Sequence, residues 1–369
     1  MVGRRLSAGS ILSQLPALKV SLMYVTPAPD ADNDPLYAVR FGLTGMLGYA
    51  AVAVFNPVLP AVMAAMPLAI IAGQRKAFNP VAAIAGPVVL IAMAFVTAWM
   101  VEQLLPMPLV LIGAMWLCFF LGFRMILKTG SPVGMIVVVL PLLMSIMGMN
   151  GTMALDAMRL ALVQAALLTL VLGPVVYMLL PPRTQERHVA VPAPGVGQVE
   201  IGAAIRATVL LALSFWLYSV MQPSDLMMAL IAAMVIVFPS RLRVWDEAFQ
   251  RIRATLYGAA MALLLLAFFM VSARLPIILG LIFLSGLFLG TKMMQGKRPS
   301  MVYQYAFSVT LALVAGALST QDPAYASFTR IILTLLGAFT AAFAVALLDD
   351  LTGWHGDQPE NEGATQEAA

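Results

Sequence analysis

The sequence contains few of the residues that redox chemistry, metal binding and nucleophilic catalysis require. One cysteine, Cys118, and two histidines, His188 and His355, occur in 369 residues. A lone cysteine inside an apolar run makes no disulfide framework and no thiolate metal cluster, and both histidines lie outside the apolar runs. A Gly-x-x-x-x-Gly-Lys-Ser/Thr nucleotide motif is also missing, which argues against direct use of ATP. We therefore expect no enzyme activity, no cofactor and no metal site.

Charge is scarce as well. Charged residues make up 10% of the chain and hydrophobic residues 62%, and the mean hydropathy is +0.94. This composition leaves too little polar surface to cover a water-soluble globule of this length. The basic residues stand singly and in pairs between apolar runs, so they form no phosphate-binding patch and we expect no nucleic acid partner. The chain is expected to lie in membrane lipid.

Twelve apolar segments follow one another along the chain. A helix crosses the hydrocarbon layer with roughly 20 apolar residues, or fewer where neighbouring helices shield it. The expected spans are 39–56, 59–74, 79–101, 107–127, 132–149 and 154–180 in the first half, and 203–221, 225–239, 252–273, 276–292, 300–318 and 328–348 in the second. We therefore predict an all-α integral membrane protein with about twelve transmembrane helices.

The basic residues give this topology an orientation. With the N-terminus in the cytoplasm, eighteen of the 21 lysines and arginines fall on the inside, and only Arg159, Arg274 and Arg330 fall outside. Such a bias follows the positive-inside pattern, and an error of one span would destroy it. We expect a multi-pass protein of the bacterial inner membrane with both termini in the cytoplasm.

The two halves repeat each other. An offset of 166 residues pairs Arg40 with Arg206, Pro57 with Pro223 and Arg75 with Arg241, and the offset grows to 168 for FLGFR (120–124) and FLGTK (288–292) and to 171 for Arg159 and Arg330. Six spans in each half is an even number, so both halves enter the membrane in the same orientation. We predict two parallel six-helix repeats, an organisation common among transporters.

The repeats divide the chain into five regions. They are a cytoplasmic N-terminal tail at 1–36 without a signal peptide, the first repeat at 37–180, a polar and proline-rich cytoplasmic linker at 181–199, the second repeat at 200–350, and an acidic, disordered tail at 351–369. From Arg241 to Arg253 the second half carries an insertion rich in charges of both signs. This segment is either a helix along the cytoplasmic face or a solvated loop.

The second span of each half is short. Pro57 and Pro223 precede these segments, and polar residues, Asn56, Gln222 and Asp225, lie nearby. Short, proline-flanked spans at matching positions of two repeats indicate a substrate site. The alternative is a tight outer hairpin in which the polar residues cap helices.

Several motifs of the sequence resemble one known family. RIRATLYGAAMA (251–262), the helix-opening Arg40 and Arg206, and TRIILTLLGAFTAAF (329–343) are similar to the fusaric acid resistance protein-like family of aromatic acid exporters. The resemblance implies an inner-membrane exporter of small aromatic or amphipathic carboxylates, often working with a periplasmic adaptor protein. Larger members carry a cytoplasmic domain for which this chain has only its linker and tail. The family supplies no binding residues to carry over.

Two arginines break the charge bias at matching positions. Arg159 and Arg330 each stand at the outer start of the last span of a half, and a guanidinium offers a planar fork of donors to a carboxylate. We expect both to bind an anionic substrate. The alternative is that each arginine reaches the lipid headgroups or links neighbouring helices.

Proton coupling requires a carboxylate that changes its protonation during transport. The outward candidates are Asp156, Glu102 and Asp322, and Asp156 is preferred because it stands three residues before Arg159 and shares its helix face. The predicted function is proton-gradient-driven efflux of small aromatic or amphipathic organic acids. A non-catalytic membrane subunit that scaffolds an envelope complex is the alternative, and a homo-oligomer is compatible with both.

Overall fold

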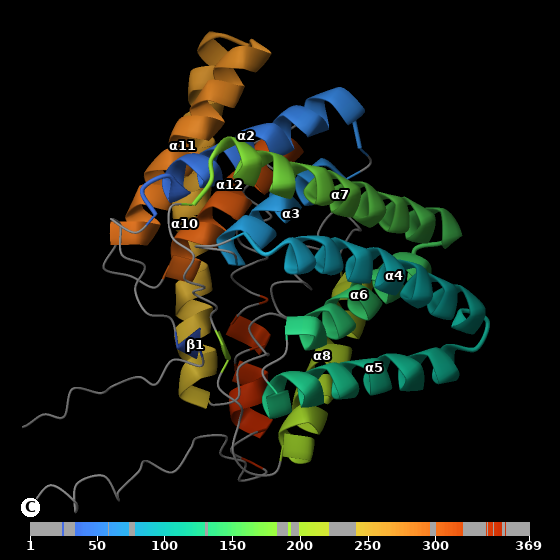
Figure 1. Cartoon of the computed structure of the whole chain (residues 1–369). Helices are drawn as coiled ribbons and strands as arrows, with labels where there is room; N and C mark the ends of the chain where they lie inside the picture. Colours follow the sequence, from blue (N-terminus) through green and yellow to red (C-terminus); the bar gives the residue numbers. More distant parts are fainter. Residues whose placement is uncertain are drawn as a thin grey trace, which may run out of the picture.

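The protein was analysed as a computed structural model, which describes residues 24–25, 34–57, 59–73, 78–129, 132–182, 191–192, 199–220, 241–295 and 300–319, together with 337, 339–341, 343–348 and 351. Helices make up nearly all of this part of the chain (Figure 1). They are α2 (Tyr37–Phe55), α3 (Pro60–Gly73), α4 (Pro80–Leu104), α5 (Pro108–Thr129), α6 (Pro132–Met149), α7 (Thr152–Leu179), α8 (Val199–Val220), α10 (Arg241–Val271), α11 (Leu275–Gln295) and α12 (Ser300–Ser319).

Each of these helices lies where a span was expected. The expected span at 225–239 is outside the described residues, and the one at 328–348 is described only in part. Six helices are long and apolar enough to cross a membrane, and their outward side chains are large and apolar, as at Leu109 (83% exposed) and Met178 (87% exposed). Apolar groups on this scale face lipid rather than water. The chain is therefore a multi-pass helical membrane protein.

The second helix of the first half is short, as predicted. α3 has 14 residues, so at 1.5 Å per residue it extends about 21 Å, less than the roughly 30 Å of a hydrocarbon core. It begins at Pro60, where the missing N–H costs nothing because the first turn of a helix has no acceptor for it. Asn56 ends α2 in the left-handed conformation (φ 43°, ψ 59°), with its N–H bonded to the carbonyl of Val52.

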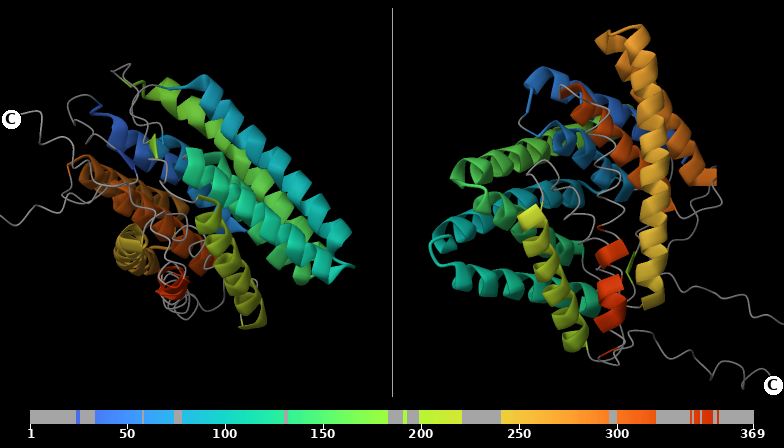
Figure 2. Two further views of the ribbon diagram at one scale, coloured as in Figure 1. Left: turned by 90° about the horizontal axis from the view of Figure 1, so that it is seen from below. Right: turned by 180° about the vertical axis from the view of Figure 1, so that it is seen from behind.

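The charged insertion is helical, as one of the two expected forms has it, but it is not a separate helix. Arg241 to Arg253 is the first part of α10, which continues without a break to Val271. A helix of 31 residues is about 46 Å long, more than the roughly 30 Å of a hydrocarbon core. It is the longest of the described helices, and the right-hand view of Figure 2 shows it along its length. The charged turns are therefore an extension of a span and not a separate surface helix or a loop.

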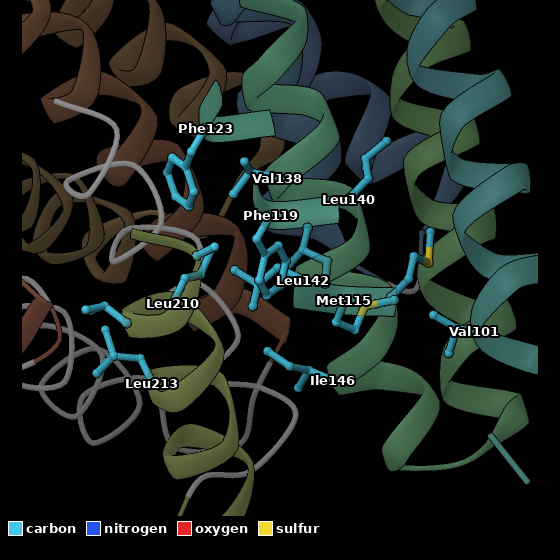
Figure 3. Packing of buried hydrophobic residues seen from close by; sticks show 14 of the residues in the cluster. Val101, Met115, Phe119, Phe123, Val138, Leu140, Leu142, Ile146, Leu210 and Leu213 are labelled. Atoms are coloured by element: carbon cyan, nitrogen blue, oxygen red, sulfur yellow. The ribbon is translucent and has the colours of Figure 1, made fainter. Parts of the chain in front are cut away.

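The helices form two packing groups that do not follow the order of the chain. In one group, α4, α5, α6 and α7 pack with α8 and with Ala341 and Val345 of the last apolar segment. Figure 3 labels buried side chains of this group from α4, α5, α6 and α8. In the other, α2 and α3 pack with α10, α11 and α12. Figures 1 and 2 show the same exchange, with α2 and α3 beside α11 and α12 while α8 lies beside α5.

Two of these contacts occupy matching positions under the repeat offset of 166 to 168 residues. α8 matches α2 and α11 matches α5, so the contact of α2 with α11 has its equivalent in that of α8 with α5. The two contacts differ in chemistry. Where α2 meets α11, Gly42 faces Gly286, whereas where α8 meets α5 the Trp116 indole Nε1 donates to Thr208 Oγ1 at 3.0 Å.

One short strand pair departs from the all-helical expectation. Tyr24–Val25 (β1) pairs antiparallel with Val191–Pro192 (β2), with Tyr24 opposite Pro192. The pair joins the region predicted as an N-terminal tail to the region predicted as a linker. Alternation over so few residues gave no strand signal in the sequence.

The glycine contact between α2 and α11 leads to a prediction. A Cβ at Gly286 would lie 2.6 Å from Gly42 Cα and 2.6 Å from Phe307 Cζ, whereas a Cβ at Gly280, on the same helix, would meet nothing within 4 Å. Gly286→Ala should destabilise the fold by about 1–3 kcal/mol, because the backbones must separate to admit the methyl group. Gly280→Ala should not. Thermal unfolding in detergent compares the two, and equal melting temperatures would contradict the packing described.

Candidate functional site

An arginine and a carboxylate are buried together near the start of α2. The Arg40 side chain is 0% exposed and that of Asp34 is 3% exposed. Arg40 Nη2 donates to Asp34 Oδ2, and Nη1 donates to the carbonyl of Leu180, just after α7, at 3.2 Å. A charge in an apolar interior costs several kcal/mol unless a partner compensates it, so this pair is held where single charges would not be tolerated.

Aromatic rings surround the guanidinium. Its Cζ lies 5.1 Å from the ring centroid of Tyr177, on α7, and 5.9 Å from that of Tyr37, on α2. Contacts at this distance attract a cation to the ring face. The rings of Phe41 and Phe307 lie 5.0 Å apart, and Tyr37 Oη lies 4.0 Å from Met293 Sδ, so helices α11 and α12 of the second half also border the cluster.

The local sequence accounts for this placement. Tyr37, Arg40, Phe41 and Thr44 recur three and four residues apart, so they share the buried face of α2. Thr44 Oγ1 donates to the Arg40 carbonyl at 2.8 Å, which satisfies that hydroxyl within the helix. Asp34 lies before the helix, where its backbone carbonyl accepts a hydrogen bond from the Tyr37 N–H at 3.1 Å. Its side-chain carboxylate contacts the guanidinium of Arg40, six residues further along the chain.

The guanidinium is not fully bonded. Among the described residues, Arg40 Nε is buried and has no hydrogen-bond acceptor. Nε and Nη2 are the two donors of one edge of an arginine, and together they match the two oxygens of a carboxylate. Asp34 binds only one of them. The site therefore has an unused donor beside a bound carboxylate.

The matching arginine of the second half is also buried. Arg206 is 0% exposed and its Nη1 donates to the Gly202 carbonyl at 3.2 Å. The 166-residue offset that pairs Arg206 with Arg40 also pairs Glu200 with Asp34. Glu200 takes another partner, because its Oε1 lies 3.3 Å from Arg124 Nε of α5 and its side chain is 61% exposed. The carboxylate positions of the two halves have thus diverged.

Glu200 lies before the apolar part of α8. Two hydrogen bonds lower the pKa of its carboxyl below the usual value. The larger effect comes from its own backbone N–H and the smaller from the Arg124 side chain. It is therefore an ordinary charged surface carboxylate, in contrast to the enclosed Asp34.

The predicted outer pair is present. Asp156 Oδ1 and Arg159 Nη2 are 2.7 Å apart on the first turns of α7, as their spacing predicted, and the Arg159 guanidinium lies 5.4 Å from the Phe95 ring of α4. The two side chains are 61% and 34% exposed. Glu102 is exposed and stands two turns beyond Phe95 on the same face of α4.

The remaining predicted residues are Asn56 and four residues outside the described part of the chain. Asn56 ends α2, where its backbone N–H closes the last turn, and its role at a substrate site stays a prediction. Arg330, Gln222, Asp225 and Asp322 lie outside the described residues. Their roles stay predictions.

Sequence reasoning missed two residues. It attributed Arg40 to membrane topology, whereas the structure encloses it, and it passed over Gln164, whose Oε1 is buried in the middle of α7 with no hydrogen-bond partner in the described part of the chain. A signal for Arg40 was available, because an aspartate six residues before it has a matching glutamate before Arg206. Gln164 has no such match.

The comparisons with known proteins identify the class. The fold defines a multi-pass helical membrane protein that encloses charged residues. The model of the fusaric acid resistance protein-like family matches residues 211–344, from α8 to the last apolar segment. The match confirms the predicted resemblance over this part of the chain. Searches of curated proteins and of solved structures gave no match.

The buried pair predicts an asymmetric response to mutation. Arg40→Met should destabilise the protein by about 3–5 kcal/mol, because Asp34 would then be a buried charge without its counterion. The double variant Asp34→Leu/Arg40→Met should recover most of that loss. Arg124→Gln, which breaks the exposed pair with Glu200, should leave the melting temperature unchanged. Thermal unfolding in detergent measures all three, and an Arg40→Met variant as stable as the parent would contradict the buried pair.

Proposed function

We propose that the protein is a membrane transporter that exports small aromatic or amphipathic organic acids. The observation that carries the proposal is the enclosed Arg40, a cation bordered by aromatic rings inside a body of apolar helices. Ionisable residues enclosed among membrane helices are costly and mark substrate or ion pathways in membrane proteins. The family match over 211–344 supports a transport role for the same chain.

The arrangement of the helices supports a transport mechanism in which two helix bundles move against each other. We propose that the two halves are parallel repeats of six helices that exchange their first helices, because the contact of α2 with α11 and that of α8 with α5 are related by the repeat offset. Two similar bundles joined in this way rock about a shared centre, which is how repeated transporters alternate between two openings.

The outer pair supports a second point on the anion path. Arg159 is the partly exposed arginine at the outer end of α7 in the expected topology, and its guanidinium rests on a ring, a setting that suits an aromatic carboxylate. We place Arg330 at the matching position of the second repeat. Asp156, bonded to Arg159, is the preferred proton-coupling group, with Glu102 and Asp322 as the other candidates.

A scaffold is the second candidate function. The charged first turns of the long α10, on the cytoplasmic side in the expected topology, offer a surface for a partner in an envelope complex. A scaffold has no need of an enclosed cation, however, so the transporter is preferred.

Transport in vesicles separates the two functions. Inverted membrane vesicles containing the protein should accumulate radiolabelled benzoate when a proton gradient is imposed, because an exporter oriented as expected moves its substrate into such vesicles. The control is the same vesicles after the gradient is collapsed with an uncoupler. A scaffold would show no accumulation in either case and would instead co-purify with a fixed partner.

The outer residues give a more specific prediction. Arg159→Ala and Arg330→Ala should each lower the uptake rate by about tenfold or more, since each removes a charge-assisted contact with the carboxylate. Asp156→Asn should abolish uptake driven by the proton gradient and leave benzoate exchange intact.

Arg274→Ala is the matched control, because Arg274 is an exposed arginine on the same expected side of the membrane. It should transport normally. Full uptake by both Arg159→Ala and Arg330→Ala, at normal membrane levels, would remove these residues from the path. Unchanged gradient-driven uptake by Asp156→Asn would exclude that carboxylate as the coupling group.

A further inference from the structure

The buried pair at Arg40 has the composition of a ligand site that is already occupied. The cation is fully enclosed, one edge of its guanidinium is half used, and its surroundings are rings and aliphatic side chains. An arginine that served structure alone would gain from an acceptor on every buried donor, since a buried donor without a partner costs about 1–3 kcal/mol. Arg40 Nε has none.

The surroundings of Arg40 match one class of molecule. The Tyr177 ring contacts the guanidinium and lies 5.0 Å from the ring of Phe78, and Leu43 and Leu47 pack against the same cluster. A flat apolar molecule packs well among such side chains, and its charged end requires a single anionic group with two acceptors. A monocyclic aromatic carboxylate meets both conditions.

We propose that Arg40 is the carboxylate-binding residue of an inner substrate site and that Asp34 is an internal substitute for the carboxylate of the substrate. The substrate carboxylate replaces that of Asp34 and takes both Nε and Nη2, while its ring packs beside Tyr177. The exchange puts one anion in place of another, so the net charge of the enclosed site does not change. Asp34 precedes α2, so its displacement in this exchange requires no residue of the helix to move.

The location suits an exporter. The site lies where α2 begins and α7 ends, which is the cytoplasmic end in the expected topology, and there an exporter collects its substrate. The inference rests on the proposed function and adds the residues that hold the substrate. Asp34 then keeps the site neutral whenever no substrate is bound, which avoids a buried, unpaired guanidinium in the empty transporter.

Removal of the internal carboxylate tests the proposal. Benzoate should bind purified Asp34→Asn at least about tenfold more tightly than the parent, because the competitor is gone and Arg40 keeps its charge. Benzoate should also raise the melting temperature of Asp34→Asn more than that of the parent. Glu200→Gln, which removes the carboxylate at the matching position of the second half, should bind benzoate as the parent does. Weaker or unchanged binding by Asp34→Asn would overturn the proposal.

Ligand chemistry gives a second measurement that needs no change at Asp34. The parent protein should bind benzoate, bind benzyl alcohol far more weakly because it has no charge, and bind acetate far more weakly because it has no ring. Tyr177→Leu should weaken benzoate binding by about 3- to 10-fold and leave the weak binding of acetate unchanged. Equal loss for both anions, or no loss for either, would contradict a ring packed beside Tyr177. This holds even if Asp34→Asn does not fold.

The outcomes separate this inference from the proposed function. If vesicles transport benzoate but Asp34→Asn and Tyr177→Leu bind it as the parent does, the protein is a transporter whose site lies elsewhere and the inference is wrong. If the parent neither binds nor transports benzoate, while its thermal unfolding is normal, the proposed function fails for this class of substrate and the inference fails with it.

Discussion

The guanidinium of Arg40 lies wholly inside a body of apolar helices, where an uncompensated charge costs several kcal/mol. Three segments of the chain meet at this guanidinium. Asp34 folds back from the segment before α2, α7 ends with the Leu180 carbonyl directed at Nη1, and Tyr37 and Tyr177 line the cation. The start of the first span and the end of the sixth are thereby joined at one end of the molecule.

Helix α7 has charged groups beside both of its ends. α7 begins with the Asp156–Arg159 pair and ends beside Arg40, and its middle holds Gln164 with a buried oxygen that has no partner among the described residues. α7 also packs against α2, α3, α4 and α6, so it contacts helices of both packing groups. In the proposed function, the anion path from Arg40 to Arg159 follows this helix. The glycine contact of α2 with α11 then provides a close junction between the halves.

Much of the fold could be predicted from the sequence because long apolar runs bounded by proline have few alternatives to a membrane helix. Thus α6 begins and ends where its span was expected, and α3 is as short as expected. The exchange of first helices could not be predicted, since apolar runs do not say which neighbour they pack against. The continuity of α10 was missed because its charged turns differ in composition from its apolar part. The Asp156–Arg159 pair was predictable because helix geometry alone brings residues three apart together. The Asp34–Arg40 pair was not, because it depends on a chain reversal before α2 and on the end of a helix 140 residues away.

The central claim is that an arginine enclosed by this fold binds the carboxylate of the substrate. An experimental structure of the protein with 4-iodobenzoate, in which the anomalous signal of the iodine locates the ligand, tests it most directly. The account predicts iodine density beside Tyr177 and a carboxylate on Nε and Nη2 of Arg40, with the Asp34 side chain displaced. Iodine density at another place, with the Asp34–Arg40 contact intact, would contradict it.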